Sequence, residues 1–185
     1  MVLSKNMQKL VAGSSTIRKL FEEGIELAKE VGAENVYDFS LGNPAAPVPE
    51  EVKKSIYDIL ENRNANFVHC YMPNAGYPEV REKVAANLNK KYNSSFTKDD
   101  IIMTVGAAGG INCVLRSLLE PEDEVLCFAP FFGEYNSYVM NFGGNLKVVP
   151  ADYETFQLNV EEADKYITER TKAVIINNPN NPSGV

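Results

Sequence analysis

The stretch that decides the fold runs from residue 101 to residue 119 and reads IIMTVGAAGGINCVLRSLL. Its first five residues, 101–105, are apolar and mostly β-branched, which is typical of a strand buried on both faces. Residues 106–110 are all glycine or alanine. Apolar residues then recur at helical spacing, which predicts an amphipathic helix over 111–119. The pattern therefore predicts a strand, a tight turn of small residues and a helix.

The small residues of this turn have two interpretations. The first amides of a helix lack internal partners and lie at the positive end of its dipole, so a phosphate can bind there. Alternatively, the glycines only let the strand and the helix pack closely. A P-loop is excluded because Ile111 and Asn112 stand where Lys and Ser or Thr are needed. A dinucleotide-binding fold is excluded by the glycine spacing and because the next strand ends in Ala129 and Pro130 instead of an acid.

The composition bounds the class of protein. A chain of 185 residues is long enough for one good core and too short for two full-sized domains. The net charge of −7 and the lack of a basic cluster argue against nucleic acid and against an anionic membrane surface. The amino terminus lacks the apolar core of a signal peptide, and no apolar run approaches membrane-spanning length. We expect a cytoplasmic protein.

The cysteines and the single histidine predict no metal site. Cys70, Cys113 and Cys127 are odd in number, unclustered and set in apolar or helical contexts, so we expect them to be buried thiols in a reducing compartment. His69 has no Cys or His at ligand spacing, which favours a structural or surface histidine.

Helical and strand patterns divide the rest of the chain. Helices are expected from 14–16 to Gly32, from Pro49, and from Pro78, with a short strand over 35–41 between the first two. From residue 101 strands and helices alternate, which predicts an α/β fold with a mainly parallel sheet. The remaining strands are expected over 125–128, 146–149 and 173–177. Between them we expect two helices. The first covers 135–142, and the second begins with a capping box of Asn159 and Glu162 and runs through Tyr166.

Three loops follow the carboxyl ends of these strands, where open parallel sheets bind ligands. They contain the small-residue backbone at Gly106, the aromatic side chains of Phe131 and Phe132, and the carboxamide of Asn181. Backbone amides suit a phosphate, a phenyl ring can stack on a heterocycle, and an amide can bond a ring substituent. Together they predict a pocket for a phosphorylated aromatic cofactor.

Five motifs, in order along the chain, make the sequence similar to one family. They are Leu41-Gly42-Asn43-Pro44, Tyr71-Met72-Pro73-Asn74-Ala75-Gly76 through Val80-Arg81, Thr104-Val105-Gly106-Ala107-Ala108, Pro130-Phe131-Phe132 and Asn178-Pro179-Asn180-Asn181-Pro182-Ser183-Gly184. With this order and spacing the chain resembles the class I and II aminotransferases, pyridoxal-phosphate enzymes of fold type I of the aspartate aminotransferase kind. The resemblance implies a three-layer α/β/α large domain whose cofactor is pyridoxal 5'-phosphate.

The resemblance also implies roles for individual residues. The backbone of Gly106, Ala107 and Ala108 would donate to the cofactor phosphate, and Phe132 would stack on the pyridine ring. Asn181 would bond the ring hydroxyl and help hold the substrate carboxylate. Phe132 could instead be a core residue, whereas Asn181, in a polar loop between two prolines, is hard to explain by packing.

Two further residues are implied outside these loops. Gly42 would lie beside the substrate and leave room for its carboxylate. Tyr71 would reach the cofactor phosphate of the partner subunit, since members of the family are dimers with shared sites. Each could instead be a turn or core residue.

The resemblance further implies that the chain is the amino-terminal portion of such an enzyme. Residues 1–48 would form an arm and a small-domain segment, and 49–185 part of the cofactor-binding large domain. The family's Schiff-base lysine lies after the Asn-Pro-(Ser/Thr)-Gly loop, and Lys172 matches no catalytic position. We therefore expect the chain alone to be inactive, and the parent enzyme to move an amino group between an amino acid and a 2-oxo acid. The alternatives are a fold type I C–S lyase and a non-catalytic association or regulatory module.

The same resemblance predicts exposed edges. In the family, strands from later in the chain separate the strand over 101–105 from the other three. Unpaired edges and uncovered apolar faces promote association. We expect the isolated chain to dimerise, to exchange segments or to pair with a second fragment.

Overall fold

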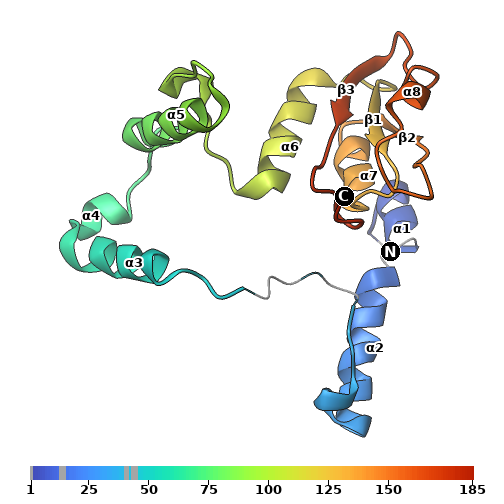
Figure 1. Ribbon diagram of the computed structural model, residues 1–185, viewed down its shortest axis with the longest axis horizontal. Helices are drawn as coiled ribbons and strands as arrows, with labels where there is room; N and C mark the ends of the chain where they lie inside the picture. Colours follow the sequence, from blue (N-terminus) through green and yellow to red (C-terminus); the bar gives the residue numbers. More distant parts are fainter. Residues whose placement is uncertain (1, 13–15, 40–41, 43–45) are drawn as a thin grey trace. The chain divides into compact units, whose positions relative to one another are not determined.

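The computed structural model describes the 185-residue chain except for residues 1, 13–15, 40–41 and 43–45. The chain separates into two compact units, Met1–Cys70 and Tyr71–Val185. Each unit is described by itself below, with the elements labelled as in Figure 1.

The first unit is helical. Its elements are α1 (Lys5–Ala12), α2 (Thr16–Val31), the short 3-10 helix η1 (Ala33–Asn35), α3 (Glu50–Asn62) and α4 (Ala65–Val68). The sequence predicted α2 and α3, but not α1 or α4. Pro49, expected in the first turn of α3, is instead its N-cap, one residue before the helix. The short strand over 35–41 is wrong where the structure describes it, because residues 36–39 belong to no strand; residues 40–41 lie outside the described part. The predicted motif residues 41 and 43–44 lie outside it too.

The second unit begins with α5 (Pro78–Tyr92) and η2 (Lys98–Asp100). Pro78 occupies the first turn of α5, as predicted, because its missing N–H has no helical partner there. Arg81 Nη1 donates to the carbonyl oxygens of Lys98 at 2.7 Å and Ile101 at 3.4 Å. The backbone N–H of Met103 donates to Ala75 O at 3.0 Å. These bonds hold residues 98–103 against α5 and the turn that precedes it.

A three-stranded parallel sheet forms the centre of this unit. Its strands are β1 (Glu124–Phe128), β2 (Asn145–Val149) and β3 (Thr171–Ile175), in the order β2-β1-β3. Val125 of β1 lies opposite Leu146 and Ala173 of its neighbours. Every residue of β1 is buried, as expected of a central strand covered on both faces. The parallel sheet and its three strands are confirmed, with β3 beginning and ending two residues earlier than predicted.

Helices cover both faces of this sheet, which confirms the α/β/α arrangement. On one face, α6 (Gly106–Leu118) and α7 (Glu134–Met140) contribute Leu115 and Val139 to a cluster with Val125. On the other face, Leu126 and the short helix α8 (Val160–Ala163) belong to a second cluster. Half of the predicted capping box is present, since Asn159 Oδ1 accepts from the N–H of Glu162 at 3.3 Å, while the Glu162 carboxylate pairs with Lys165. The α-helix ends at Ala163 and not at Tyr166.

The predicted strand over 101–105 is wrong in this structure. These residues belong to none of the described strands, and the side chains of Ile102 and Val105 are 71% and 95% exposed. The physical reason is pairing: a strand needs a neighbour to satisfy its backbone groups, and the three-stranded sheet runs no further than β2 and β3. An apolar run predicts burial, but it does not supply the neighbour.

The prediction for the cysteines is right for one thiol and wrong for two. Cys127 is buried in β1, whereas Cys70 and Cys113 are exposed. Cys113 lies on α6, which buries only the side that contains Leu115; Val114 and Leu118 are 54% and 46% exposed.

Among the described helices, none is both long and apolar enough to cross a membrane.

Candidate functional site

The loops that the sequence singled out lie at one end of the second unit. Because β1 and β3 are parallel, the segments that follow them, 129–133 and 176–185, leave the sheet at the same edge. A Cβ atom on Gly144, the residue before β2, would lie 3.0 Å from Leu119 Cδ1, so α6 ends near the amino ends of the strands. The first turn of α6 therefore points toward their carboxyl ends, as Figure 1 shows.

The first turn of α6 is open and has no side-chain cap. Val105 at the N-cap position makes no capping hydrogen bond, so the leading amides of the helix are not occupied by a side chain. Gly106 has a φ of +69°, a left-handed conformation that favours glycine, and no atom lies within 4 Å of the position where its Cβ would be. Ala107 and Ala108 are exposed. The N–H of Gly106 donates to Thr104 O at 3.0 Å, so the amides of Ala107 and Ala108 are the ones left open to an anion.

Of the other two glycines, which both lie inside α6, only Gly110 fits the packing interpretation. A Cβ atom on Gly110 would lie 3.2 Å from Thr104 Oγ1, which is tighter than most real Cβ contacts. At Gly109 the nearest atoms, on Thr104 and Val105, are 3.8 and 3.9 Å away, an ordinary contact. Gly110 therefore lets residue 104 lie close against α6, while Gly106 to Ala108 face open space.

The loop after β1 presents an aromatic ring at this edge. Phe132 is 38% exposed, and its ring meets that of Tyr135 edge to face, with 5.7 Å between the centroids. Tyr135 itself is buried at the start of α7, and its N–H donates to Phe132 O at 3.0 Å. Burial raises the pKa of the Tyr135 phenol, with smaller contributions from Cys127 and Tyr138. Tyr135 thus supports one edge of the Phe132 ring, and part of that ring stays accessible.

The loop after β3 is tied to the loop after β1 by a residue that the sequence did not assign. Asn180 Nδ2 donates to Pro130 O at 2.8 Å and to Ser183 Oγ at 3.0 Å. The neighbouring Asn181 is exposed, and its carboxamide makes no hydrogen bond with the described part of the chain. The only signal in the sequence is the pair of adjacent asparagines, and nothing in it says which one faces the fold.

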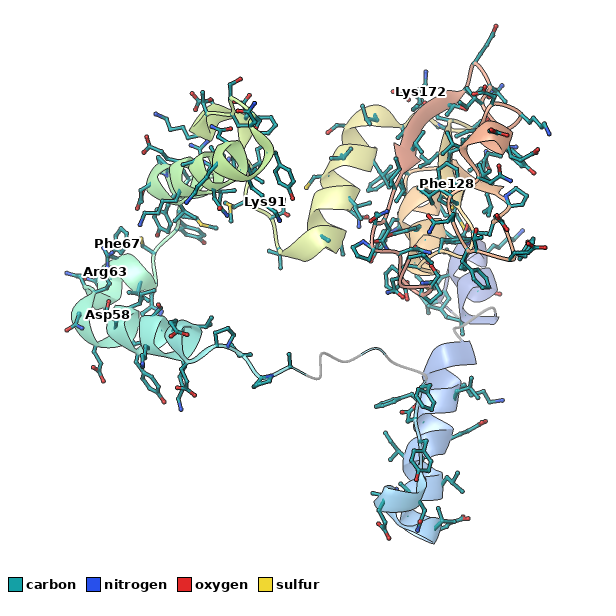
Figure 2. The ribbon with its side chains drawn as sticks, viewed as in Figure 1. Asp58, Arg63, Phe67, Lys91, Phe128 and Lys172 are labelled. Carbon is teal, nitrogen blue, oxygen red and sulfur yellow. The ribbon has the colours of Figure 1, made fainter. Side chains whose placement is uncertain are left out.

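Tyr71 and Lys172 belong to the second unit but not to these loops, and Gly42 belongs to the first unit. Tyr71 is fully exposed, at 104%, ahead of α5. Gly42 is exposed in the first unit, with no described atom within 4 Å of its Cβ position. Lys172 is the second residue of β3, so it lies toward the amino end of that strand and away from the loop that follows it (Figure 2).

Comparisons with known proteins identify the family. The sequence profile "Aminotransferase class I and II" matches residues 33–185. The chain is 37% identical to "Aromatic-amino-acid aminotransferase 2" of Thermococcus litoralis over 187 aligned positions, covering all of this chain and 45% of that protein. It is also 37% identical to the "Aspartate aminotransferase" of Pyrococcus abyssi, covering 92% of this chain and 42% of that protein.

Solved structures agree with this assignment. An aminotransferase from Eubacterium rectale superposes with a TM-score of 0.94 at 40% identity, over all of this chain and 47% of that one. Aspartate aminotransferase of Thermus thermophilus, as a single mutant, gives 0.85 at 30% identity, again over all of this chain and 47% of that one. The chain belongs to the class I and II aminotransferase family, and it spans less than half the length of the relatives named here.

Proposed function

We propose that the carboxyl edge of this sheet is part of the pyridoxal 5'-phosphate site of an aminotransferase. The described residues fit such a group. The uncapped first turn of α6 offers the backbone amides of Ala107 and Ala108 to the phosphate, at the positive end of a 13-residue helix. The amide of Gly106 would join them once the phosphate replaced Thr104 O as its acceptor. Phe132 offers a partly exposed ring for stacking, and Asn181 offers a free carboxamide for the ring hydroxyl.

One observation carries the proposal: the bond from Asn180 to Pro130 O joins the two loops that hold Phe132 and Asn181. The bond holds these two loops together, although Phe132 and Asn181 are 49 positions apart in the sequence. Packing on Tyr135 accounts for the buried part of the Phe132 ring. Binding of a flat, polar ring would account for its exposed part and for the carboxamide of Asn181, which is unbonded among the described residues.

The chemistry of such an enzyme is shared between the cofactor and the protein. When bound, pyridoxal 5'-phosphate withdraws electrons from the amino-acid substrate and carries its amino group to a 2-oxo acid. The residues of this chain would bind and orient: the α6 amides hold the phosphate, Phe132 holds the plane of the ring, and Asn181 holds the ring hydroxyl and the substrate carboxylate. Gly42 would leave room for that carboxylate.

The complete reaction is proposed for a protein of the length of the relatives, which are more than twice as long as this chain. We propose that this protein is a cytoplasmic homodimer, in which the exposed Tyr71 reaches the cofactor phosphate of the partner subunit.

Equilibrium dialysis with pyridoxal 5'-phosphate and with pyridoxal tests the site. The chain should prefer the phosphorylated form, because the α6 amides contribute only when the phosphate is present. Phe132→Ala and Asn181→Ala should each weaken binding of the phosphorylated form about tenfold, or ~1.4 kcal/mol. Asn178→Ala, in the same loop, is the control and should bind as the parent chain does. Equal affinity for both forms, or binding unaffected by either variant, would contradict the proposal.

A further inference from the structure

Asn180 uses nearly all of its polar groups inside the protein. Its backbone N–H donates to Val185 O and its carbonyl accepts from the N–H of Gly184, both at 2.7 Å, which closes residues 180–185 into a compact turn. Its side-chain amide uses both hydrogens, one on Pro130 O and one on Ser183 Oγ. One residue thus fixes the shape of its own loop and the distance of that loop from the loop after β1.

The next residue behaves in the opposite way. Asn181 is exposed, and its carboxamide has no hydrogen-bond partner in the described residues, so it is free to bond a ligand. Two identical side chains thus have different surroundings: that of Asn180 bonds to the protein, and that of Asn181 faces solvent. The bonds of Asn180 fix the place of the Asn181 backbone, because the two residues are joined by a single peptide unit, and so they limit where the free carboxamide can reach.

We propose that Asn180 is a positioning residue that sets the Phe132 ring and the Asn181 carboxamide at a fixed separation without itself contacting the cofactor. The part that concerns cofactor binding rests on the proposed function. The coupling between the two loops does not, because it follows from the bond between Asn180 and Pro130.

The chemistry of this bond defines the variants. Pro130 O can only accept a hydrogen bond, so the group that faces it must be a donor. Asn180→Asp keeps the shape and replaces the donor by a carboxylate oxygen, which repels the carbonyl. Asn180→Ser removes the amide without adding charge. Asn178→Asp adds the same charge two residues away at an exposed position and is the matched control.

Fluorine NMR of the chain labelled with 4-fluorophenylalanine tests the coupling without any cofactor. The Phe132 resonance is identified by its loss in Phe132→Leu, and it senses the edge-to-face ring of Tyr135. We expect Asn180→Asp and Asn180→Ser to move this resonance toward the position of an exposed phenylalanine, and Asn178→Asp to leave it in place. The resonance of Phe128, buried in the core at 8% exposure, reports whether each variant is folded.

The shift of the Phe132 resonance is compared only in an Asn180 variant that keeps the Phe128 resonance and is therefore folded. A variant that fails to fold does not decide whether the two loops are coupled. If Phe132 moves and Phe128 does not, the coupling is supported. If such a folded variant keeps the Phe132 resonance of the parent chain, or if Asn178→Asp moves it equally, the proposal is overturned.

Dialysis with pyridoxal 5'-phosphate then separates the two proposals. Asn180→Ser should weaken binding at least tenfold, although its side chain lies outside the proposed contacts, and Asn178→Asp should not. A shifted Phe132 resonance together with undiminished binding would overturn the role of Asn180 toward the cofactor. A parent chain that shows the coupling but does not bind the cofactor would contradict the proposed function and leave the coupling supported.

Discussion

Two glycines at the start of α6, three residues apart, should respond in opposite ways to replacement by alanine. Gly109 is inside the helix with an ordinary helical φ, whereas Gly106 has a φ of +69°. The two changes add the same methyl group to the same turn. The difference between them therefore reports the backbone conformation at which the proposed phosphate site begins.

Gly109→Ala should stabilise the second unit. Alanine is favoured over glycine in a helix interior, and at a compatible position the gain is about 0.4–1 kcal/mol. The new methyl would meet Thr104 Cβ at 3.8 Å and Val105 Cβ at 3.9 Å, which are van der Waals contacts without a clash. Packing therefore does not cancel the gain.

Gly106→Ala should destabilise the same unit. Its methyl would meet nothing within 4 Å, so the cost lies entirely in the left-handed backbone, roughly 1–2 kcal/mol for a residue with a Cβ. The two variants should thus differ by about 1.5–3 kcal/mol when both effects are added. Gly106→Asn is the control, because asparagine tolerates this conformation better than alanine, and its cost should be smaller.

Urea unfolding followed by near-ultraviolet circular dichroism measures these differences, since the buried Tyr135 of the same unit contributes to the signal. The reasoning would be refuted if Gly106→Ala were as stable as Gly109→Ala, or if Gly106→Asn were less stable than Gly106→Ala. The first result would mean that residue 106 is not left-handed in the folded chain.

Three further predictions follow from single side chains. Burial raises the pKa of the Cys127 thiol to about 12, so iodoacetamide at pH 8 should modify the exposed Cys70 and Cys113 and spare Cys127 until urea is added, as read by peptide mass spectrometry. The bond from Thr168 and then that from Lys147 lower the pKa of Glu124 from its ordinary value of 4.5. Its contribution to stability is therefore complete above pH 4.5 and is lost as the pH falls through the lower, folded pKa, and Glu124→Gln should flatten acid unfolding in that range. Arg81→Met removes the donor to two carbonyl groups and should lower the free energy of unfolding by about 1–3 kcal/mol. The local sign should be faster hydrogen exchange at the backbone N–H of Met103. Unchanged exchange there would contradict the role of Arg81 in holding residues 98–103.

Local pattern was sufficient to predict much of this fold. Short apolar runs predicted all three strands of the sheet, and Pro49 and Pro78 predicted the starts of α3 and α5 to within a residue. These signals succeed because they report a preference of the backbone or a need for burial at each residue. The run over 101–105 is as apolar as β1, yet only β1 has neighbours on both sides. Pairing is a property of two segments, so a single segment cannot predict it.

The candidate site shows the same limit at the scale of one residue. Parallel strands place Phe132 and Asn181 at one edge, and that much follows from the order of the elements. Which of the two adjacent asparagines is free for a ligand depends on a hydrogen bond to the carbonyl of Pro130, 50 residues earlier than Asn180. The spacing of residues in the sequence does not predict that bond. If the bond between Asn180 and Pro130 holds the site together, Asn181 would contact the ligand and Asn180 would determine where that contact is made. The residue that sets the geometry would then be the one to which the sequence motif assigns no role.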